Sequence, residues 1–347
     1  MVFPSVEELA GWIGLSDTEA VRALHARAYA VKEEVVGRRV SMRGLIEAGN
    51  VCAKDCCYCG IRRSNMKVAR YRLSKEEIVS CARFAAESGY GSVVIQSGEI
   101  EGEEHTRFIE AVLRAIAPLQ LGVTLSLGEQ SEEAYRCWHD AGATRYLLRI
   151  ETSNPDLYAA IHPPSCSFVR RVECLRALRR CGYQVGTGVM VGLPGQTLED
   201  LARDIVFFRD IDADMIGMGP YIPHPDTPLA AAAADWSVEA ALRLGLNMVA
   251  AARIALRDVN IAAATALQAL DPLGREKGLL AGANVVMPNI TDVKYRAQYK
   301  LYAGKPCLDE SAVLCRSCLQ RRIKSIGETV LWGVPGDSAH FFARQNA

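Results

Sequence analysis

Strand-like and helix-like segments alternate through most of the chain, and this alternation limits the fold more than any other feature of the sequence. Short apolar runs with β-branched residues recur between longer segments of helical periodicity. Successive parallel strands need a long crossover, which is usually a helix, so the alternation is typical of a parallel α/β protein. Eight strands joined by helices predict a complete (βα)8 TIM-type barrel.

The expected elements cover most of the sequence after residue 38. Strands are expected at residues 39–47, 92–96, 123–127, 145–150, 184–191, 215–218, 261–264 and 285–287. Helices are expected at residues 75–88, 103–117, 132–141, 168–181, 198–209 and 238–257. The segment 261–264 is rich in alanine and would also suit a helix.

Segments on either side of the expected barrel divide the chain into three parts. Ser16-Asp-Thr-Glu19 has the form of a capping box, and it predicts an amphipathic helix that ends near Val36. We therefore expect an N-terminal helical preface (1–38), the barrel (39–304), and a C-terminal helical extension (305–347) packed on the barrel. A length of 347 residues and an apolar content of 50% suit a barrel with such additions.

Composition argues against several classes of partner. Lysine plus arginine and aspartate plus glutamate both number 40, so no net positive field attracts nucleic acid. No apolar stretch approaches the roughly 20 residues needed to cross a bilayer, so no membrane partner is expected. The N-terminus lacks the pattern of a secretory signal. With twelve cysteines, this predicts a reducing cytoplasmic location, where disulfides are rare.

Three cysteines follow the first expected strand in a Cys-x3-Cys-x2-Cys array: Cys52, Cys56 and Cys59. A structural zinc or a closed iron-sulfur cluster normally takes four protein ligands, so three thiolates leave one position for another ligand. The array resembles the signature of radical SAM enzymes, including the aromatic Tyr58 before the last cysteine. That resemblance implies a 4Fe-4S cluster whose open iron takes S-adenosyl-L-methionine (SAM). A partial zinc site is the alternative.

In a barrel of this type, the chemistry lies at the carboxyl ends of the strands. The second expected strand ends in Gln96-Ser-Gly-Glu99, where Glu99 can bind an ammonium group. The segment resembles the Gly-Gly-Glu of radical SAM enzymes, with Ser97 replacing the first glycine, although an ordinary turn would have the same composition. After the fifth strand, a glycine-rich segment containing Met190 looks like the adenine-contacting segment of that family, where isoleucine is usual.

Strand alternation puts Arg145, Arg149 and Glu151 on one face of the fourth strand. Charges that face a barrel interior need a partner or a ligand. The arginines could hold an anionic substrate and Glu151 could reach a ribose hydroxyl, although an internal Arg-Glu pair would also satisfy itself. Arg170, at the start of the next helix, is expected by resemblance to pair with the cofactor carboxylate, unless it is simply solvated.

A second array near the C-terminus contains Cys307, Cys315 and Cys318. Its Cys-x7-Cys-x2-Cys spacing is looser than that of the first array. These cysteines are expected to bind an auxiliary iron-sulfur cluster, or else to be free thiols that flank a helix.

Nearly the whole chain resembles the HydE-type maturases of FeFe hydrogenases, which are radical SAM enzymes. The matching segments are residues 42–50, 96–99, 147–152, 190–195, 219–228 and 287–291, together with the late cysteine spacing, which biotin synthase lacks. The resemblance implies reductive cleavage of SAM to a 5′-deoxyadenosyl radical that acts on a cysteine-bound iron carbonyl-cyanide precursor of the two-iron subcluster. It also implies the partner maturases HydG and HydF and a reductant protein.

The same resemblance assigns residues to an anionic substrate. Thr124, Arg145, Arg149, Thr265 and Met287 match the anion-binding positions, and Tyr299 and Tyr302 match positions close to the substrate. The family often has two adjacent threonines after the seventh strand, whereas this chain has Ala264 before Thr265. The missing hydroxyl puts substrate hydrogen bonds at this point in doubt.

Three other functions stay open on the sequence alone. 3-Methylornithine synthase shares much of the pattern and would use SAM to rearrange lysine, but the late cysteine array counts against it. Biotin synthase would need ligands for a sacrificial 2Fe-2S cluster inside the barrel, and no matching set is visible. A non-catalytic iron-sulfur carrier would have no need for segments that hold a methionyl amino group or an adenine.

Overall fold

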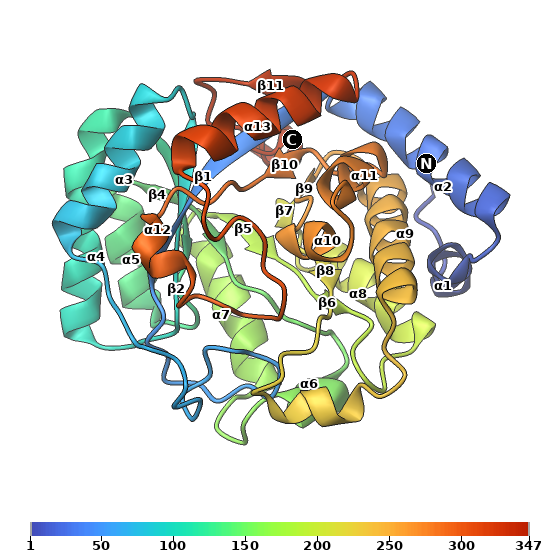
Figure 1. Cartoon of the computed structure of the whole chain (residues 1–347), viewed down its shortest axis with the longest axis horizontal. Helices are drawn as coiled ribbons and strands as arrows, with labels where there is room; N and C mark the ends of the chain where they lie inside the picture. Colours follow the sequence, from blue (N-terminus) through green and yellow to red (C-terminus); the bar gives the residue numbers. More distant parts are fainter. Residues whose placement is uncertain (1, 346–347) are drawn as a thin grey trace.

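The computed structural model describes residues 2–345, and its centre is a strongly curled parallel sheet surrounded by helices (Figure 1). The main ladder has the order β10-β1-β2-β3-β4-β5-β7-β9, and each of these pairings is parallel. The strands are β1 (Arg39–Gly49), β2 (Ser92–Ser97), β3 (Gly122–Ser126), β4 (Ala143–Leu147), β5 (Gln184–Thr187), β7 (Met215–Ile216), β9 (Asn260–Ile261) and β10 (Val285–Val286). The prediction of a parallel α/β fold is confirmed.

The ladder is open between β9 and β10. In the described part of the chain, an isolated parallel bridge from Ala262 to Val285 and two backbone hydrogen bonds of 2.9 Å span this gap. The expected complete barrel is therefore observed as a curled sheet whose ladder does not run all the way round. The reason is the brevity of the late strands, since β7, β9 and β10 each give way to loops after two residues.

Two expected strands are interrupted. The chain leaves β5 and β7 and then forms β6 (Met190–Val191) and β8 (Gly219–Pro220), which pair with each other as a separate two-stranded sheet. A Cβ at Gly188 would lie 2.0 Å from the carbonyl oxygen of Gly217, so this close approach requires glycine. The single strands expected at 184–191 and 215–218 are wrong in this respect.

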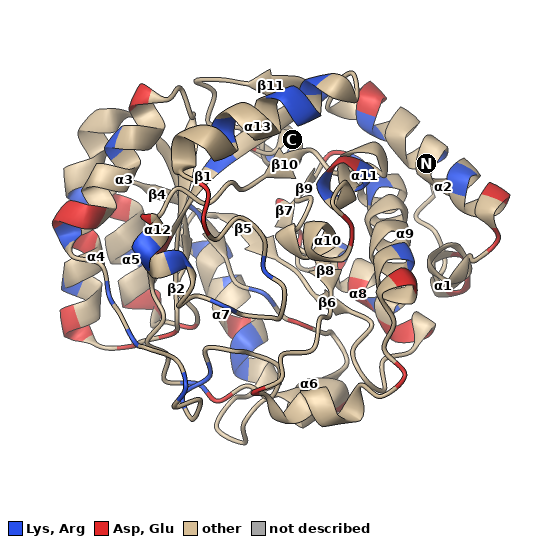
Figure 2. Cartoon of the chain, in the orientation of Figure 1, with Lys and Arg blue, Asp and Glu red and all other residues tan. Residues whose placement is uncertain are grey.

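Helices connect the strands and cover the outside of the sheet. The expected helices are present as α3 (Lys75–Glu87), α4 (Glu103–Ile116), α5 (Glu132–Asp140), α7 (Phe168–Arg180), α8 (Leu198–Asp210) and α9 (Val238–Leu256). Four shorter helices were not expected: α6 (Pro155–Ile161), α10 (Thr265–Leu270), α11 (Gly274–Leu280) and α12 (Val293–Arg296). Charged residues of both signs lie on the outer helices, whereas the central strands are mostly uncharged (Figure 2). No helix within residues 2–345 combines the length and the apolar character that a bilayer span requires.

Two helices precede the sheet. They are α1 (Val6–Gly14), which packs against α8 and α9, and α2 (Thr18–Val35), which packs against α9. The capping box expected at Ser16 is wrong: Asp17 caps α2, and its carboxylate accepts hydrogen bonds from the backbone of Glu19 and Ala20. The carboxylate is the stronger acceptor for the free amides of the first turn.

The C-terminal segment contains α13 (Ala312–Ser325), β11 (Thr329–Leu331) and α14 (Ala339–Gln345). It is not purely helical as expected, because β11 pairs in parallel with the first residues of β1. Residues 333–338, here called the C-terminal tail, then contact Arg43 and Asn260, which donate to the carbonyl oxygen of Gly336 at 2.9 and 3.0 Å. Arg43 is level with the first residue of β2, so the tail covers the amino ends of the strands. The carboxyl ends stay available for a site.

Candidate active site

A cavity of about 360 Å³ lies at the carboxyl ends of the strands. Its wall includes residues from β1, from the loop that carries the first cysteine array, from the ends of β2 and β4, and from the segments 262–266 and 299–305. This is the end of a parallel α/β sheet at which ligands bind. The volume falls within the range of small-molecule sites.

Cys52, Cys56 and Cys59 line this cavity, whereas the adjacent Cys57 does not. Their loop is held by its backbone: Arg70 donates to the carbonyl oxygens of Asn50, Ile61 and Arg62 at 2.6–2.7 Å. Burial raises the pKa of Cys59 to about 12 and also raises that of Cys56, so both are neutral thiols until a metal displaces the proton. The loop thus presents three of its four sulfurs to one space.

Gly98 packs the end of β2 closely against the cysteine loop. A Cβ at this position would lie 2.3 Å from the carbonyl oxygen of Val51 and 2.8 Å from Cβ of Cys52, so the approach requires glycine. The backbone N–H of Glu99 points at the sulfur of Cys52 at 3.4 Å. The Gln96–Glu99 segment is therefore packed directly on a predicted metal ligand, which an ordinary strand-to-loop turn would not require.

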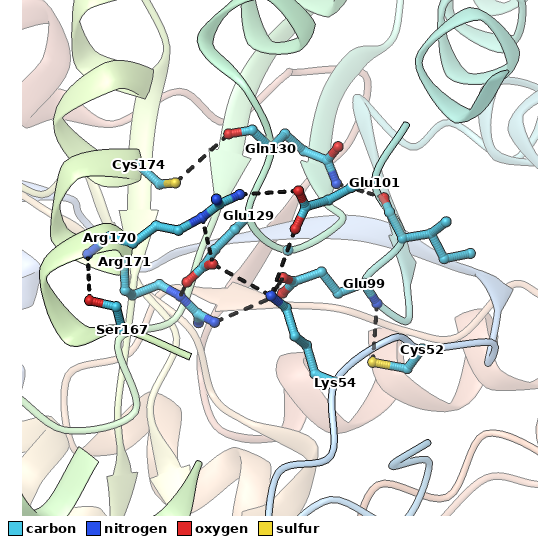
Figure 3. A network of polar contacts seen from close by, with 12 residues as sticks. Cys52, Lys54, Glu99, Glu101, Glu129, Gln130, Ser167, Arg170, Arg171 and Cys174 are labelled. Atoms are coloured by element: carbon cyan, nitrogen blue, oxygen red, sulfur yellow. Dashed lines mark hydrogen bonds and ion pairs between the residues drawn. The ribbon is translucent and has the colours of Figure 1, made fainter. Parts of the chain in front are cut away.

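Beyond Gly98, the carboxylate of Glu99 belongs to a buried charge network (Figure 3). Lys54 Nζ lies 3.1 Å from Glu99 Oε1 and 3.7 Å from Glu129 Oε2. Arg171 binds Glu129 at 2.7 Å and approaches Glu99 at 3.8 Å. Burial favours the neutral form of Glu129, but the charge and hydrogen bond of Arg171 outweigh it and lower its pKa. The pKa of Glu99 is raised by burial despite the same cations.

Arg170 and Arg171 lie differently around this network. Arg171 is buried and lines the cavity, whereas the side chain of Arg170 is half exposed and pairs with Glu101 and Glu129 at 3.1 and 3.2 Å. Sequence reasoning selected Arg170 and missed Arg171. Helical periodicity could have predicted that Arg171 points inward, because it shares the buried face of α7 with Cys174, Leu175 and Leu178.

Glu151 follows β4 in a left-handed conformation, with φ of 67°. Its backbone pairs with the chain before β6, since the N–H of Met190 donates to its carbonyl oxygen at 3.0 Å. Its carboxylate lies 2.9 Å from the guanidinium of Arg149, and burial raises its pKa. Tyr58 lies beside this group, and its hydroxyl contacts His162 Nε2 at 3.2 Å. Glu151, Met190, Arg149 and Tyr58 all line the cavity.

Comparison with known proteins shows the family of this chain. Residues 46–208 match the family model of the Radical SAM superfamily. Over 315 residues the chain is 44% identical to the FeFe hydrogenase maturase subunit HydE of Thermotoga maritima, a match that covers 91% of this chain and 88% of the relative. The chain belongs to the HydE family of radical SAM enzymes.

Solved structures of other enzymes share the fold of this HydE-family protein. Methylornithine synthase, PylB, superimposes with a TM-score of 0.82 at 22% identity, covering 96% of this chain and 95% of that one. HydG from Carboxydothermus hydrogenoformans superimposes with a TM-score of 0.80 at 20% identity, covering 95% and 76%. At these identities the likeness supports the architecture alone.

Membership of the radical SAM superfamily implies a 4Fe-4S cluster and SAM as cofactors, and the residues present fit both. Three thiols share the cavity wall with two carboxylates. Within residues 2–345, Glu99 Oε1 and Glu151 Oε2 are buried and accept no aligned hydrogen bond, although each lies in an ion pair, with Lys54 at 3.1 Å and with Arg149 at 2.9 Å. Buried acceptors without an aligned hydrogen bond are costly, so a ligand that brings donors would be bound favourably here. SAM carries such donors in its ammonium group and its ribose hydroxyls.

The residues expected to hold the substrate separate into two groups. Arg149, Thr265, Met287, Tyr299 and Tyr302 line the cavity, whereas Thr124 and Arg145 do not. Arg145 instead binds Asp337 of the C-terminal tail at 2.5 Å and Pro335 O at 3.0 Å. Its position explains this, because Arg145 is level with the first residue of β5 and lies nearer the amino ends of the strands. Thr124 is its neighbour on β3, fully buried. Neither residue lies at the cavity in this structure.

A buried ion pair between Glu47 and Lys305 was missed by the sequence analysis. Both residues line the cavity, and Lys305 also donates to the carbonyl oxygen of Tyr299 at 2.8 Å. Burial raises the pKa of Glu47 and lowers that of Lys305. Strand alternation on β1 could have placed Glu47 beside Leu45 on the cavity face, but no pattern marks Lys305, which lies in a loop.

Only two of the three cysteines in the second array of this HydE-family chain lie close together. Ligand atoms of Cys307, Glu310 and Cys315 lie within 4.8 Å of one another, and Cys318 is not in this group. Cys307 has a φ of 61°, and its carbonyl oxygen accepts from buried Arg296. A hydrogen bond from Cys315 lowers the pKa of Cys307. None of the three cysteines lines the large cavity.

Proposed function

We propose that this protein uses a 4Fe-4S cluster on Cys52, Cys56 and Cys59 to cleave SAM in hydrogenase maturation. One observation carries the proposal: three half-buried thiols, and two carboxylates whose buried oxygens accept no aligned hydrogen bond within the described residues, share the wall of one cavity. When bound, the cluster and SAM supply the reductive chemistry that generates a 5′-deoxyadenosyl radical. The protein's task is to position the cofactor and to exclude water.

The cavity residues have separate roles in this proposal. Glu99 binds the ammonium group of SAM, and Glu151 binds a ribose hydroxyl. Arg171 takes the carboxylate, with Arg170 behind it as a second cation, because Arg171 is the arginine that lines the cavity. Met190 and Tyr58 contact the adenine. Fixed partners of this kind hold the reacting atoms in register without acid-base catalysis.

The closed end of the sheet protects the reaction. The C-terminal tail covers the amino ends of the strands, where Arg43 and Asn260 hold the carbonyl oxygen of Gly336. The tail thus shields the amino ends of the strands, and at the other end the bound cofactor would fill the cavity. A primary carbon radical abstracts hydrogen from most organic groups, so such exclusion protects both enzyme and substrate.

The substrate in this proposal is the cysteine-bound iron carbonyl-cyanide species implied by the family, supplied by HydG, with the product passing toward HydF. Arg149, Thr265 and Met287 would contact it, with Tyr299 and Tyr302 nearby. An anionic substrate fits, because Nε of Arg149 is buried and has no aligned acceptor within the described chain, while Nη2 of the same guanidinium pairs with Glu151. Lys305 is already neutralised by Glu47 and would add a dipole rather than a free charge.

The second array is proposed to hold an auxiliary cluster through Cys307, Cys315 and Cys318. The approach of Cys307 to Cys315 supports two ligands, and Cys318 follows Cys315 by one turn of α13. A change of rotamer could bring its sulfur to the same side. The carboxylate of Glu310 is a further ligand candidate.

The test is anaerobic reconstitution with iron and sulfide, reduction, and chromatography for 5′-deoxyadenosine after SAM is added. Cys56→Ala is expected to abolish the product, whereas the matched Cys57→Ala variant retains it, because Cys57 does not line the cavity. A loaded, reduced protein that forms no deoxyadenosine would favour an iron-sulfur carrier. Turnover of lysine, but not of an iron carbonyl-cyanide species, would instead favour a methylornithine synthase-like mutase, whose fold this chain shares.

A further inference from the structure

We propose that Lys54, carried on the cysteine loop, occupies the ammonium site at Glu99 until SAM arrives, and that binding exchanges one cation for the other. Lys54 is thus a positioning residue whose counter-ion changes with cofactor occupancy. This inference rests on the proposed function, since it assumes that Glu99 receives the ammonium group of SAM.

The first step is the position of Lys54. It lies between Cys52 and Cys56, its side chain is only 15% exposed, and it lines the cavity. Its ammonium faces three carboxylates at once: Glu99 at 3.1 Å, and Glu101 and Glu129 at 3.7 Å each. The nearest of these is the carboxylate to which we assign the cofactor ammonium.

The second step is the charge balance of the network in Figure 3. Lys54, Arg170 and Arg171 provide three cations, and Glu99, Glu101 and Glu129 provide three anions. The network is neutral in this arrangement. The methionyl end of SAM adds one ammonium and one carboxylate, so the balance is kept only if the existing ion pairs are redistributed. Two ammonium groups cannot share Glu99 without repulsion.

The third step is the route that Lys54 can take. Glu101 and Glu129 already lie within ion-pair distance of its nitrogen, so a small rotation of the side chain brings it to either. Glu129 Oε2 is buried and accepts no aligned hydrogen bond in the described chain, so it can accept one from Lys54 in addition to its ion pair with Arg170 at 3.2 Å. The side chain can therefore leave Glu99 without losing a counter-ion.

The exchange connects cofactor binding to the cluster ligands. Lys54 is covalently part of the cysteine loop, and the N–H of Ala53 donates to the carbonyl oxygen of Glu99 at 2.8 Å. A shift of Lys54 is thereby transmitted to the loop that carries Cys52 and Cys56. Before SAM arrives, the ion pair holds Glu99 against the loop and keeps the site assembled.

The experiment measures SAM affinity by anaerobic calorimetry on protein loaded with an oxidised cluster, so that no cleavage occurs. Lys54→Met removes the competing cation and is expected to tighten SAM binding by about tenfold. Binding of 5′-methylthioadenosine, which lacks the ammonium group, should not change. In a Glu99→Gln background, Lys54→Met should give no gain. Lys67→Met, which removes a mostly exposed charge paired with Asp226, is the control and should not alter affinity.

Several results would overturn the proposal. Unchanged or weaker SAM binding by cluster-loaded Lys54→Met means that the lysine only supports the loop. If that variant does not load a cluster, Glu101→Gln is measured in its place. It removes one of the carboxylates to which Lys54 would move, so SAM binding should weaken about threefold. Unchanged SAM binding by Glu101→Gln contradicts the exchange. Wild-type protein that loads its cluster but binds no SAM would refute the proposed function as well, which separates the two failures.

Discussion

Arg145 Nη2 lies 2.5 Å from Asp337 Oδ1, so a guanidinium inside the sheet is neutralised by a residue near the end of the chain. The arginine is almost fully buried, and Gln184 donates to the same carboxylate oxygen at 2.7 Å. The positive charge of Arg145 and the hydrogen bonds hold the pKa of Asp337 below its usual range, although burial opposes them. This contact attaches the tail to the amino ends of the strands.

Asp337→Ala is expected to lower the free energy of unfolding by about 3 kcal/mol, because it leaves Arg145 buried without its counter-ion. Chemical denaturation of the protein measures this. Asp235→Ala, at an exposed position, is the matched control and should change stability by less than about 0.5 kcal/mol. Equal effects of the two substitutions would mean that the contact between Asp337 and Arg145 contributes little to the free energy of unfolding.

Glu151 is held in a conformation that glycine adopts more easily. Glu151→Gly and Glu151→Ala both remove the carboxylate, but only glycine relieves the backbone strain at φ of 67°. The glycine variant should therefore be more stable than the alanine variant by about 1 kcal/mol. Both should bind SAM more weakly than the wild type. Thermal unfolding and calorimetry give the two quantities, and equal stability of the variants would contradict the strain.

Gly98→Ala should impair loading of the cluster. An added Cβ would meet Val51 O at 2.3 Å and would push the end of β2 away from Cys52. Iron and sulfide content after reconstitution is expected to fall several-fold while circular dichroism stays unchanged. Gly11→Ala, where nothing lies within 4 Å of the added atom, should load normally. Full loading of the Gly98 variant would show that the contact is dispensable.

Stability should fall as pH rises from about 6.5 to 9, through the titration of His340. Hydrogen bonds to Asp258 and Asp212 raise the pKa of His340 to about 9. A group with a raised folded-state pKa contributes its stability fully below its unfolded pKa of about 6.5, and that contribution is lost as pH rises through the folded value. Denaturation midpoints of wild type and His340→Gln, measured from pH 6 to 10, should converge at high pH. Parallel curves would contradict this role.

Periodicity predicted the architecture, whereas most of the expected cavity residues came from the family resemblance. The order of strands, the larger helices and the cysteine loop follow from local patterns of apolar residues and from the βα rhythm, and they are present where the sequence indicated. Strand alternation also grouped Arg149 with Glu151, which form an ion pair. The face of a strand can be predicted from its sequence because side chains alternate with a period of two.

Position along a strand cannot be predicted in the same way. Arg145 and Arg149 were assigned to one face and therefore to one site. Arg145 instead contacts the C-terminal tail, whereas Arg149, four residues later, lines the cavity. The strand rises about 3.3 Å per residue, so these side chains are more than about 10 Å apart along it. The partner of Arg145 is Asp337, which is distant in sequence, and no local signal indicates it. Lys305 was missed for the same reason.

The pairing of β11 with β1 has a consequence for synthesis on the ribosome. The first strand to emerge is completed by a strand that begins at residue 329, and the tail after it fixes Arg43 from that same first strand. Residues Arg39–Ser41 of β1 therefore lack this partner until almost the whole chain has been made, and an unpaired strand edge is a site for aggregation. Translation that stalls before this point would release a protein in which β1 cannot pair with β11. Chains truncated before residue 329 should thus be lost to aggregation, however well the cell is supplied with iron.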